Sequence, residues 1–194
     1  MRKRIFALLA VGAAAVTIAA VGIGNAAAET KGTAEMTGTA GTTEQAGTTE
    51  EGKGSSVVKT LRNTHKITEA LERKDLETVS AMTADRAVLQ HALALSGDRD
   101  EAARFVGKEQ VMGYIGGVFS TFGTINFTDV RVTVSADGRS SFVQANGDFT
   151  TADGRPYLNV YLFRYDWQNG QAVSIEEYAN PITFCRTVGH PTCA

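Results

Sequence analysis

The stretch of sequence that decides the fold is residues 137–170, which read DGRSSFVQANGDFTTADGRPYLNVYLFRYDWQNG. It contains three dipeptides that tolerate the positive φ angles of tight hairpin turns, and they recur every sixteen residues: Asp137-Gly138, Asp153-Gly154 and Asn169-Gly170. The runs beside these turns are interpreted as strands over roughly 125–134, 140–150, 157–167 and 172–178. This spacing predicts a four-stranded antiparallel meander.

Helical patterns precede the meander. Apolar residues at helical spacing run from Val58 to Leu71, and Asp75 is placed to cap a second, short helix. A third helix is expected after Gly107, with an apolar stripe within residues 111–122. This helix contains three glycines, Gly113, Gly116 and Gly117. Because glycine lowers helix stability, we expect these positions to serve close backbone packing against a neighbour.

A further strand is expected between the second and third helices. Residues 87–95 alternate with the period of a strand, which places Leu89 and His91 on the interior face. A long, twisted sheet needs an apolar cover, and the three helices are the cover available. We therefore predict an α+β domain over residues 57–194: a cone-shaped half-barrel in which a curved antiparallel sheet carries three N-terminal helices on its concave face.

The first third of the chain differs from the rest. A cationic start at residues 1–4 and an uncharged apolar run at 5–24 lead to small residues ending at Ala28, the layout of an export signal. We expect residues 1–28 to be a signal peptide and the mature protein to be secreted or extracytoplasmic; an uncleaved membrane anchor is the alternative. Residues 29–56, rich in Thr, Gly and Glu, are predicted to be a disordered linker.

Composition excludes several classes of protein. The chain has 194 residues, 43% of them hydrophobic, enough for one globular core. Its 19 Lys and Arg against 21 Asp and Glu give a net charge of −2 and no cationic field for nucleic acid. The two cysteines, Cys185 and Cys193, either form a disulfide or stay reduced. With His190 they are too few for a zinc site, and there is no glycine-rich phosphate loop, so no metal or cofactor is expected.

Three stretches carry a resemblance to a known family. They are Phe105-Val106-Gly107-Lys108-Glu109, Tyr157-Leu158-Asn159-Val160-Tyr161-Leu162-Phe163, and the ending from Asn169 to Pro181, which includes Glu176-Glu177-Tyr178. Over residues 57–181 the sequence resembles the SnoaL-like branch of the nuclear transport factor 2-like superfamily, with an ending similar to that of phenazine-biosynthesis relatives. The resemblance implies a cone with one pocket between helices and sheet, and often a homodimer formed through the sheet.

The strand over 157–167 supplies candidate ligand contacts. Alternation places Tyr157, Asn159, Tyr161 and Phe163 on one face, where rings provide area and a few polar atoms orient a ligand. The alternative is that these tyrosines are core or dimer-interface residues. Asp148, in the preceding strand, is either a further pocket acid or part of a wet outer face.

Glu177 and His91 are the candidate catalytic residues. Because Glu176 and Glu177 are consecutive in a strand, only one of them can face the cavity. The resemblance points to Glu177, since similar Glu-Tyr or Glu-Phe endings carry a pocket acid in catalytic relatives; pairing with Arg164 is the alternative. His91 would exchange protons with it; the alternative is that His91 is a core residue hydrogen-bonded to a neighbour. Tyr114 stands near the position where some relatives have a helix histidine, and it is a further candidate ligand contact.

Two functions follow from these residues. The first is an exported enzyme whose pocket binds a small hydrophobic molecule and isomerises, dehydrates or cyclises it by cofactor-free acid–base catalysis. The second is a non-catalytic extracytoplasmic module that binds a ligand or takes part in an assembly. No nucleic-acid partner is expected, and a membrane contact is expected only through an uncleaved signal segment.

Overall fold

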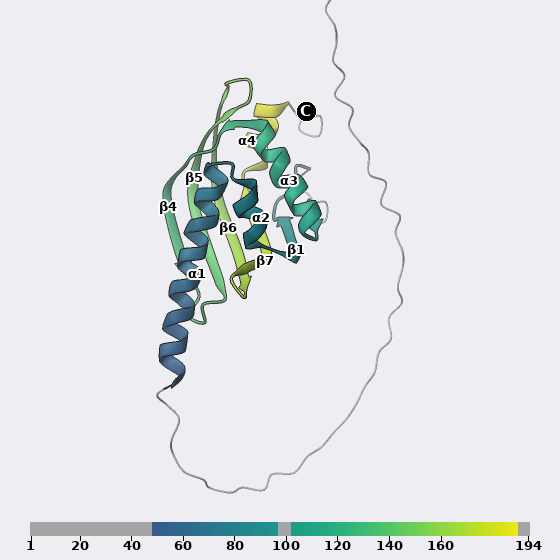
Figure 1. Ribbon diagram of the computed structural model, residues 1–194. Coiled ribbons are helices and arrows are strands. Elements are labelled where there is room, and N and C mark those ends of the chain that lie inside the picture. The colour runs from purple at the N-terminus through teal and green to yellow at the C-terminus, as the bar shows by residue number, and fades with distance from the viewer. Residues whose placement is uncertain (1–47, 97–101, 190–194) are drawn as a thin grey trace, which may run out of the picture. The chain divides into compact units, whose positions relative to one another are not determined.

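The computed structural model describes residues 48–96 and 102–189 (Figure 1). The elements in chain order are α1 (Thr48–Glu72), α2 (Leu76–Met82), β1 (Thr83–His91), β2 (Arg104–Val106), α3 (Lys108–Thr121), β3 (Phe122–Thr124), β4 (Phe127–Val134), β5 (Ser140–Thr151), β6 (Pro156–Gln168), β7 (Gln171–Ala179) and α4 (Pro181–Val188). The predicted signal peptide and most of the predicted linker lie outside the described residues. The linker boundary needs correction, because residues 48–56 belong to α1.

The predicted meander is confirmed. Strands β4, β5, β6 and β7 pair in sequence order, all antiparallel, and β5 pairs with β6 without a register shift from Ser140 opposite Asp166 to Thr150 opposite Pro156. The full order is β2-β1-β7-β6-β5-β3, with β4 also on β5. One pairing corrects the prediction of a wholly antiparallel sheet, since β1 runs parallel to β7.

The three predicted hairpin turns form as their sequences indicate. Gly138, Gly154 and Gly170 have φ angles of 68°, 85° and 83°. A residue with a Cβ is strained at such angles, so glycine at the second position of each dipeptide lets the chain reverse, within two residues between β6 and β7 and within four or five residues at the other two turns. These turns fix the register of the meander, and therefore which side chains face the helices.

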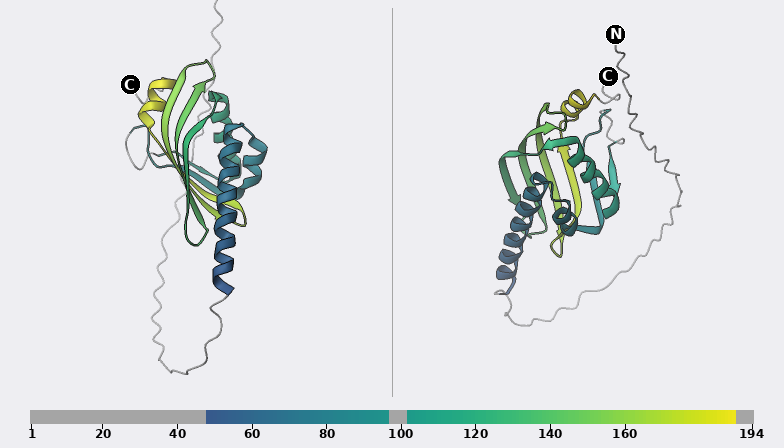
Figure 2. Two further views of the ribbon diagram at one scale, coloured as in Figure 1. Left: turned by 90° about the vertical axis from the view of Figure 1, so that its left-hand side faces the viewer. Right: turned by 45° about the horizontal axis from the view of Figure 1, so that its top comes forward.

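Helices α1, α2 and α3 cover one face of the curved sheet, as predicted; Figure 2 (left) shows the sheet edge-on with all three on its concave side. Each contributes buried apolar side chains, for example Ile67 of α1, Val79 of α2 and Val111 of α3. They pack against β1 and against the inward-facing rings of β5 and β6. Asp75 caps α2 as expected, with its carboxylate accepting a hydrogen bond from the Thr78 amide at 2.9 Å.

Several boundaries differ from the sequence prediction. Strand β1 spans Thr83–His91 and not the predicted residues 87–95, so both of its ends lie four residues earlier in the chain. It begins early because the strand follows Met82, the last residue of α2, directly. The short strands β2 and β3 were not expected, nor was α4. Asn180 caps α4 by accepting a hydrogen bond from the Ile182 amide at 3.1 Å, and Pro181 fits its first turn.

The outer face of the sheet is open and partly apolar. Alternation in β6 is strict: odd-numbered residues from Tyr157 to Trp167 are buried, while Leu158 and Val160 are 64% and 60% exposed. Among the described residues, no helix combines the length and apolar character needed to cross a bilayer.

Candidate functional site

A cavity of about 680 Å³ lies between α3, α4 and the inner face of the sheet. This is within the range of about 300–1,000 Å³ typical of sites for drug-sized ligands. Its walls are mainly aromatic, and the rings contact one another: Phe149 stacks on Tyr161 with centroids 5.5 Å apart, and Tyr161 stacks on Phe163 at 5.3 Å. Glu177 is the only acidic side chain among the described residues that line it.

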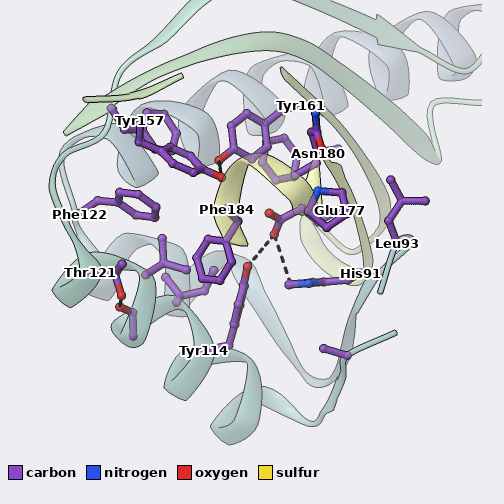
Figure 3. A pocket seen from close by; sticks show the side chains of 18 of the residues that line it. His91, Leu93, Tyr114, Thr121, Phe122, Tyr157, Tyr161, Glu177, Asn180 and Phe184 are labelled. Atoms are coloured by element: carbon purple, nitrogen blue, oxygen red, sulfur yellow. Dashed lines mark hydrogen bonds and ion pairs between the residues drawn. The ribbon is translucent and has the colours of Figure 1, made fainter. Parts of the chain in front are cut away.

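Glu177 reaches this cavity from β7. Its neighbour Glu176 faces the opposite side of the sheet, where it pairs with Arg164 at 3.5 Å between carboxylate oxygen and guanidinium nitrogen. The Glu177 side chain is 15% exposed, and its Oε2 accepts a hydrogen bond of 2.9 Å from the Tyr114 hydroxyl. Within the described part of the chain Oε1 accepts no hydrogen bond. Figure 3 shows the carboxylate pointing into the cavity.

The electrostatic surroundings of Glu177 favour its protonated form. Burial raises the pKa of the carboxyl above its ordinary value of 4.5, while His91 and the Tyr114 hydrogen bond lower it. The same burial, together with the negative charge of Glu177, raises the pKa of Tyr114 well above its ordinary value. Tyr114 is therefore a hydroxyl donor at neutral pH, and Glu177 is poised to hold or release a proton.

His91 stands beside Glu177 because of strand register. β1 and β7 place the two residues opposite each other, with 3.8 Å between His91 Nε2 and Glu177 Oε2. This is too long for a hydrogen bond, and Nε2 is buried without a partner among the described residues. The ring packs edge-on against Tyr114, with centroids 5.1 Å apart, and against Phe105 at 6.1 Å. The His91 and Glu177 side chains are therefore adjacent but not hydrogen-bonded.

Two tyrosine hydroxyls make a second polar locus in the cavity. The Tyr161 hydroxyl lies 3.4 Å from that of Tyr157, and the Asn159 amide donates to Tyr157 at 2.6 Å. Both tyrosines line the cavity, and Figure 3 shows their hydroxyls facing each other. Burial raises the pKa of both, and the charge of Glu177 raises both further, so they remain protonated donors at neutral pH.

Of the predicted ligand contacts, Tyr114, Tyr157, Tyr161 and Phe163 line the cavity, as do His91 and Glu177. Asn159 does not. Its amide nitrogen donates to Tyr157 and to the Asn180 carbonyl, and its oxygen accepts from two backbone amides, those of Val160 and Asn180. The side chain is thus fully used in fixing the Tyr157 hydroxyl and the start of α4, and it is not free to bind a ligand.

Asp148 is also corrected. It is exposed on the outer face of β5, in the same alternation as Gln144 and Asn146, and it does not line the cavity. The wet outer face that the sequence left open as an alternative is therefore the right interpretation of this strand. Sequence alternation alone separates 145, 147 and 149 from their neighbours, but it does not say which set faces inward.

The glycines of α3 also behave differently from expectation. A Cβ placed on Gly113, Gly116 or Gly117 would meet no atom within 4 Å, so these positions do not serve close backbone packing. Gly113 and Gly117 instead line the cavity. Each glycine in a helix costs about 1 kcal/mol relative to alanine, so their presence calls for another reason.

Some lining residues escaped the sequence analysis. Phe184 of α4 and Asn180, which caps this helix, line the cavity near Glu177 (Figure 3). The signal that could have found them is the pair Asn180-Pro181, a cap followed by a first-turn proline. Cys185 of the same helix is buried and disulfide-bonded. Cys193 and His190 lie outside the described residues, and among those described no group of three or more His, Cys, Asp and Glu side chains is arranged to hold a metal ion.

Comparison with known proteins places this architecture in a family. The model of the SnoaL-like domain matches residues 64–175, more than half of the chain. The chain belongs to the SnoaL-like domain family. The match includes His91, Tyr114 and the β6 tyrosines, and Glu177 follows just after it. No curated protein matches the sequence.

Solved structures share the fold of this SnoaL-like domain. A proposed isomerase from Bacillus subtilis superposes with a TM-score of 0.58 at 22% identity, covering 71% of this chain and 95% of its own. A phenazine biosynthesis-related protein from Pseudomonas aeruginosa gives 0.55 at 13% identity, covering 71% and 92%. A proposed polyketide cyclase from Xanthomonas campestris pv. campestris gives 0.53 at 17%, covering 64% and 93%. At these identities the likeness shows the fold alone.

Proposed function

We propose that this SnoaL-like domain binds a small hydrophobic molecule in its cavity and moves a proton on it without a cofactor, in an isomerisation, dehydration or cyclisation. The observation that carries the proposal is the placement of Glu177: a buried carboxyl in an aromatic cavity, held by Tyr114 at one oxygen and open to the cavity at the other. An apolar cavity with a single positioned acid suits a ligand that is mostly hydrocarbon and has one acidic C–H or one leaving hydroxyl.

Burial gives Glu177 the acid–base strength that this chemistry needs. A carboxylate with a raised pKa is a stronger base than one in water, and its acid form persists to higher pH as a donor. In an isomerisation, Glu177 takes a proton from a carbon next to a carbonyl and returns it to another carbon of the same conjugated system. If the ligand brings His91 Nε2 from 3.8 Å to within hydrogen-bond distance of Glu177 Oε2, His91 can instead take this proton from Glu177 and return it.

The hydroxyls of Tyr157 and Tyr161 can bind the ligand oxygen on which negative charge develops. Because the Asn159 oxygen is occupied by two backbone amides, its nitrogen must donate to Tyr157. Two hydroxyl protons then remain between Tyr157 and Tyr161, and the contact between these hydroxyls uses only one. The other has no acceptor among the described residues and is available to a ligand oxygen. A donor aimed at that oxygen stabilises the negative charge that develops when the proton leaves carbon.

Hydrogen exchange tests the proposal without knowledge of the natural substrate. The probe is 2-tetralone, an apolar ketone with acidic hydrogens, incubated with the full chain in D2O and followed by NMR. We expect the protein to accelerate loss of the hydrogens next to the carbonyl and Glu177→Gln to remove most of this acceleration, by about 100-fold or more. Glu176→Gln is the matched control, since it makes the same chemical change on the outer face.

The outcomes separate the two candidate functions. Equal exchange by Glu177→Gln and the unmodified protein would refute the catalytic role. Binding of 2-tetralone without accelerated exchange would favour the non-catalytic module, for which the absence of a hydrogen bond between His91 and Glu177 is the supporting observation.

Location and assembly complete the proposal. Residues 1–28 would direct export, which is tested by fractionating cells that express the full chain and determining the N-terminus of the mature protein; intact cytoplasmic protein would contradict it. The exposed Leu158 and Val160 on the outer face of β6 support a homodimer formed through the sheet.

A further inference from the structure

The glycines of α3 lack the usual reasons for glycine. None of Gly113, Gly116 and Gly117 has a positive φ, so no special backbone conformation requires them. Apart from the adjacent residues and the backbone of α3 itself, no atom lies within 4 Å of the place where a Cβ would stand on any of them, so no neighbouring element requires them either. Helix stability argues against glycine at such positions. A free space beside the helix is the remaining reason.

For two of these three glycines, the free space beside the helix is the cavity. Gly113 and Gly117 line it, and Gly116, between them in sequence, does not. Residues four apart lie on the same face of a helix, separated along its axis by about 6 Å. The two glycines therefore leave the helix backbone without a side chain at two points of the cavity wall, one helical turn apart. The residues beside them on this wall, Tyr114, Ile115 and Val118, carry side chains into the cavity lining, so the wall is set back at the glycines relative to these neighbours.

We propose that Gly113 and Gly117 are specificity-determining residues of the cavity, which admit a ligand whose flat apolar body lies along this turn of α3. The proposal rests on the ligand-binding function proposed above. The polar end of such a ligand would meet Glu177 or the tyrosine hydroxyls, and its body would cover the helix backbone. The ligand class is then a flat hydrophobic molecule with one oxygen function and a body longer than a single ring.

A series of phenols that differ in ring number tests this length requirement. Phenol, 2-naphthol and 9-phenanthrol have one, two and three fused rings and one hydroxyl each. Their affinities for the full chain are measured by isothermal titration calorimetry for the unmodified protein, Gly113→Leu, Gly117→Leu and the control Gly116→Leu. We expect the leucines at 113 and 117 to weaken 9-phenanthrol by about tenfold or more and phenol by less than about threefold.

The control should leave all three affinities within about twofold, because position 116 does not line the cavity. Far-UV circular dichroism checks folding. If a leucine variant does not fold, the double variant Gly113→Ala/Gly117→Ala is used; alanine favours the helix, and it should still weaken 9-phenanthrol by about threefold.

The experiment distinguishes a failure of the proposed ligand-binding function from a failure of the role proposed for the glycines. If the unmodified protein binds none of the phenols, both the ligand-binding function and this inference are refuted. If it binds them and the variants at 113 and 117 keep the same dependence on ring number, only the role of the glycines is refuted. An equal loss of 9-phenanthrol affinity in Gly116→Leu would also refute the role of the glycines. Any leucine in α3 would then weaken binding, whether or not its position lines the cavity.

Discussion

Glu177→Gln should make the protein more stable at neutral pH and leave its stability almost unchanged at acidic pH. Burial raises the pKa of Glu177 above its ordinary 4.5, so the folded state binds this proton more tightly than the unfolded state does. The stability that this contributes is complete below pH 4.5 and is lost as the pH rises through the folded-state pKa. Glutamine has no proton to lose, so the variant avoids this loss.

The magnitude follows from linkage. Each unit by which the folded protein raises the pKa corresponds to about 1.4 kcal/mol of unfolding free energy at high pH. Little of this is screened by solvent, because the side chain is only 15% exposed. For a domain of this size each kcal/mol moves the melting temperature by about 2–4 °C. The Tyr114 hydroxyl keeps an acceptor in the variant, since the glutamine carbonyl can replace Oε2.

Urea unfolding at pH 4, 6 and 8 measures this difference. The fluorescence of Trp167, the only tryptophan and 8% exposed, reports the transition. Asp148→Asn, which removes a carboxylate from the exposed outer face, controls for the change in net charge. The advantage of Glu177→Gln should grow with pH and then level off. An advantage that is constant, or that shrinks as pH rises, would show that the carboxyl is not buried as described.

Three further predictions concern single contacts. Asn159→Ala should lower the unfolding free energy by about 2–4 kcal/mol in urea titrations, because it leaves the Tyr157 hydroxyl and the backbone at the start of α4 short of partners; a near-neutral effect would contradict its structural role. Ser141→Ala should cost about 1–3 kcal/mol by the same method, since the buried Trp167 indole nitrogen donates to Ser141 at 2.8 Å. Val160→Glu should change stability by less than about 0.5 kcal/mol and abolish the homodimer proposed above in analytical ultracentrifugation, whereas a monomeric unmodified protein would refute that homodimer. Dimers that persist in this variant would place the interface elsewhere.

The sequence predicts the parts of the fold that depend on local chemistry. The Asp-Gly and Asn-Gly dipeptides impose backbone angles that few other pairs allow, so the meander could be read from three turns. Strand alternation then placed the odd-numbered residues of β6 together on one face, and these are the buried ones, although the sequence alone did not show that the other face is exposed. It also correctly placed Glu177 and Glu176 on opposite faces. Both predictions need only the pleat of the strand.

What the sequence could not predict depends on contacts distant along the chain. The parallel pairing of β1 with β7 joins segments more than 80 residues apart, and no local pattern encodes it. Asn159 has the alternation of a cavity residue, but its amide is occupied by the backbone of Asn180, which only the return of the chain into α4 reveals. The α3 glycines have the same sequence signature whether they pack closely or border a cavity.

The parallel pairing of β1 and β7 also explains how the candidate site is assembled. Its register sets His91 opposite Glu177, and α3, which packs on β1, brings Tyr114 to the same carboxylate. A shift of β1 by one residue would turn His91 to the other face and bring Gln90 or Ala92 inward, leaving Glu177 without a histidine beside it. The pairing of Leu89 with Ile175, both buried, opposes such a shift, because it would expose Leu89 to solvent. The packing of the core thus holds the histidine and the carboxylate together.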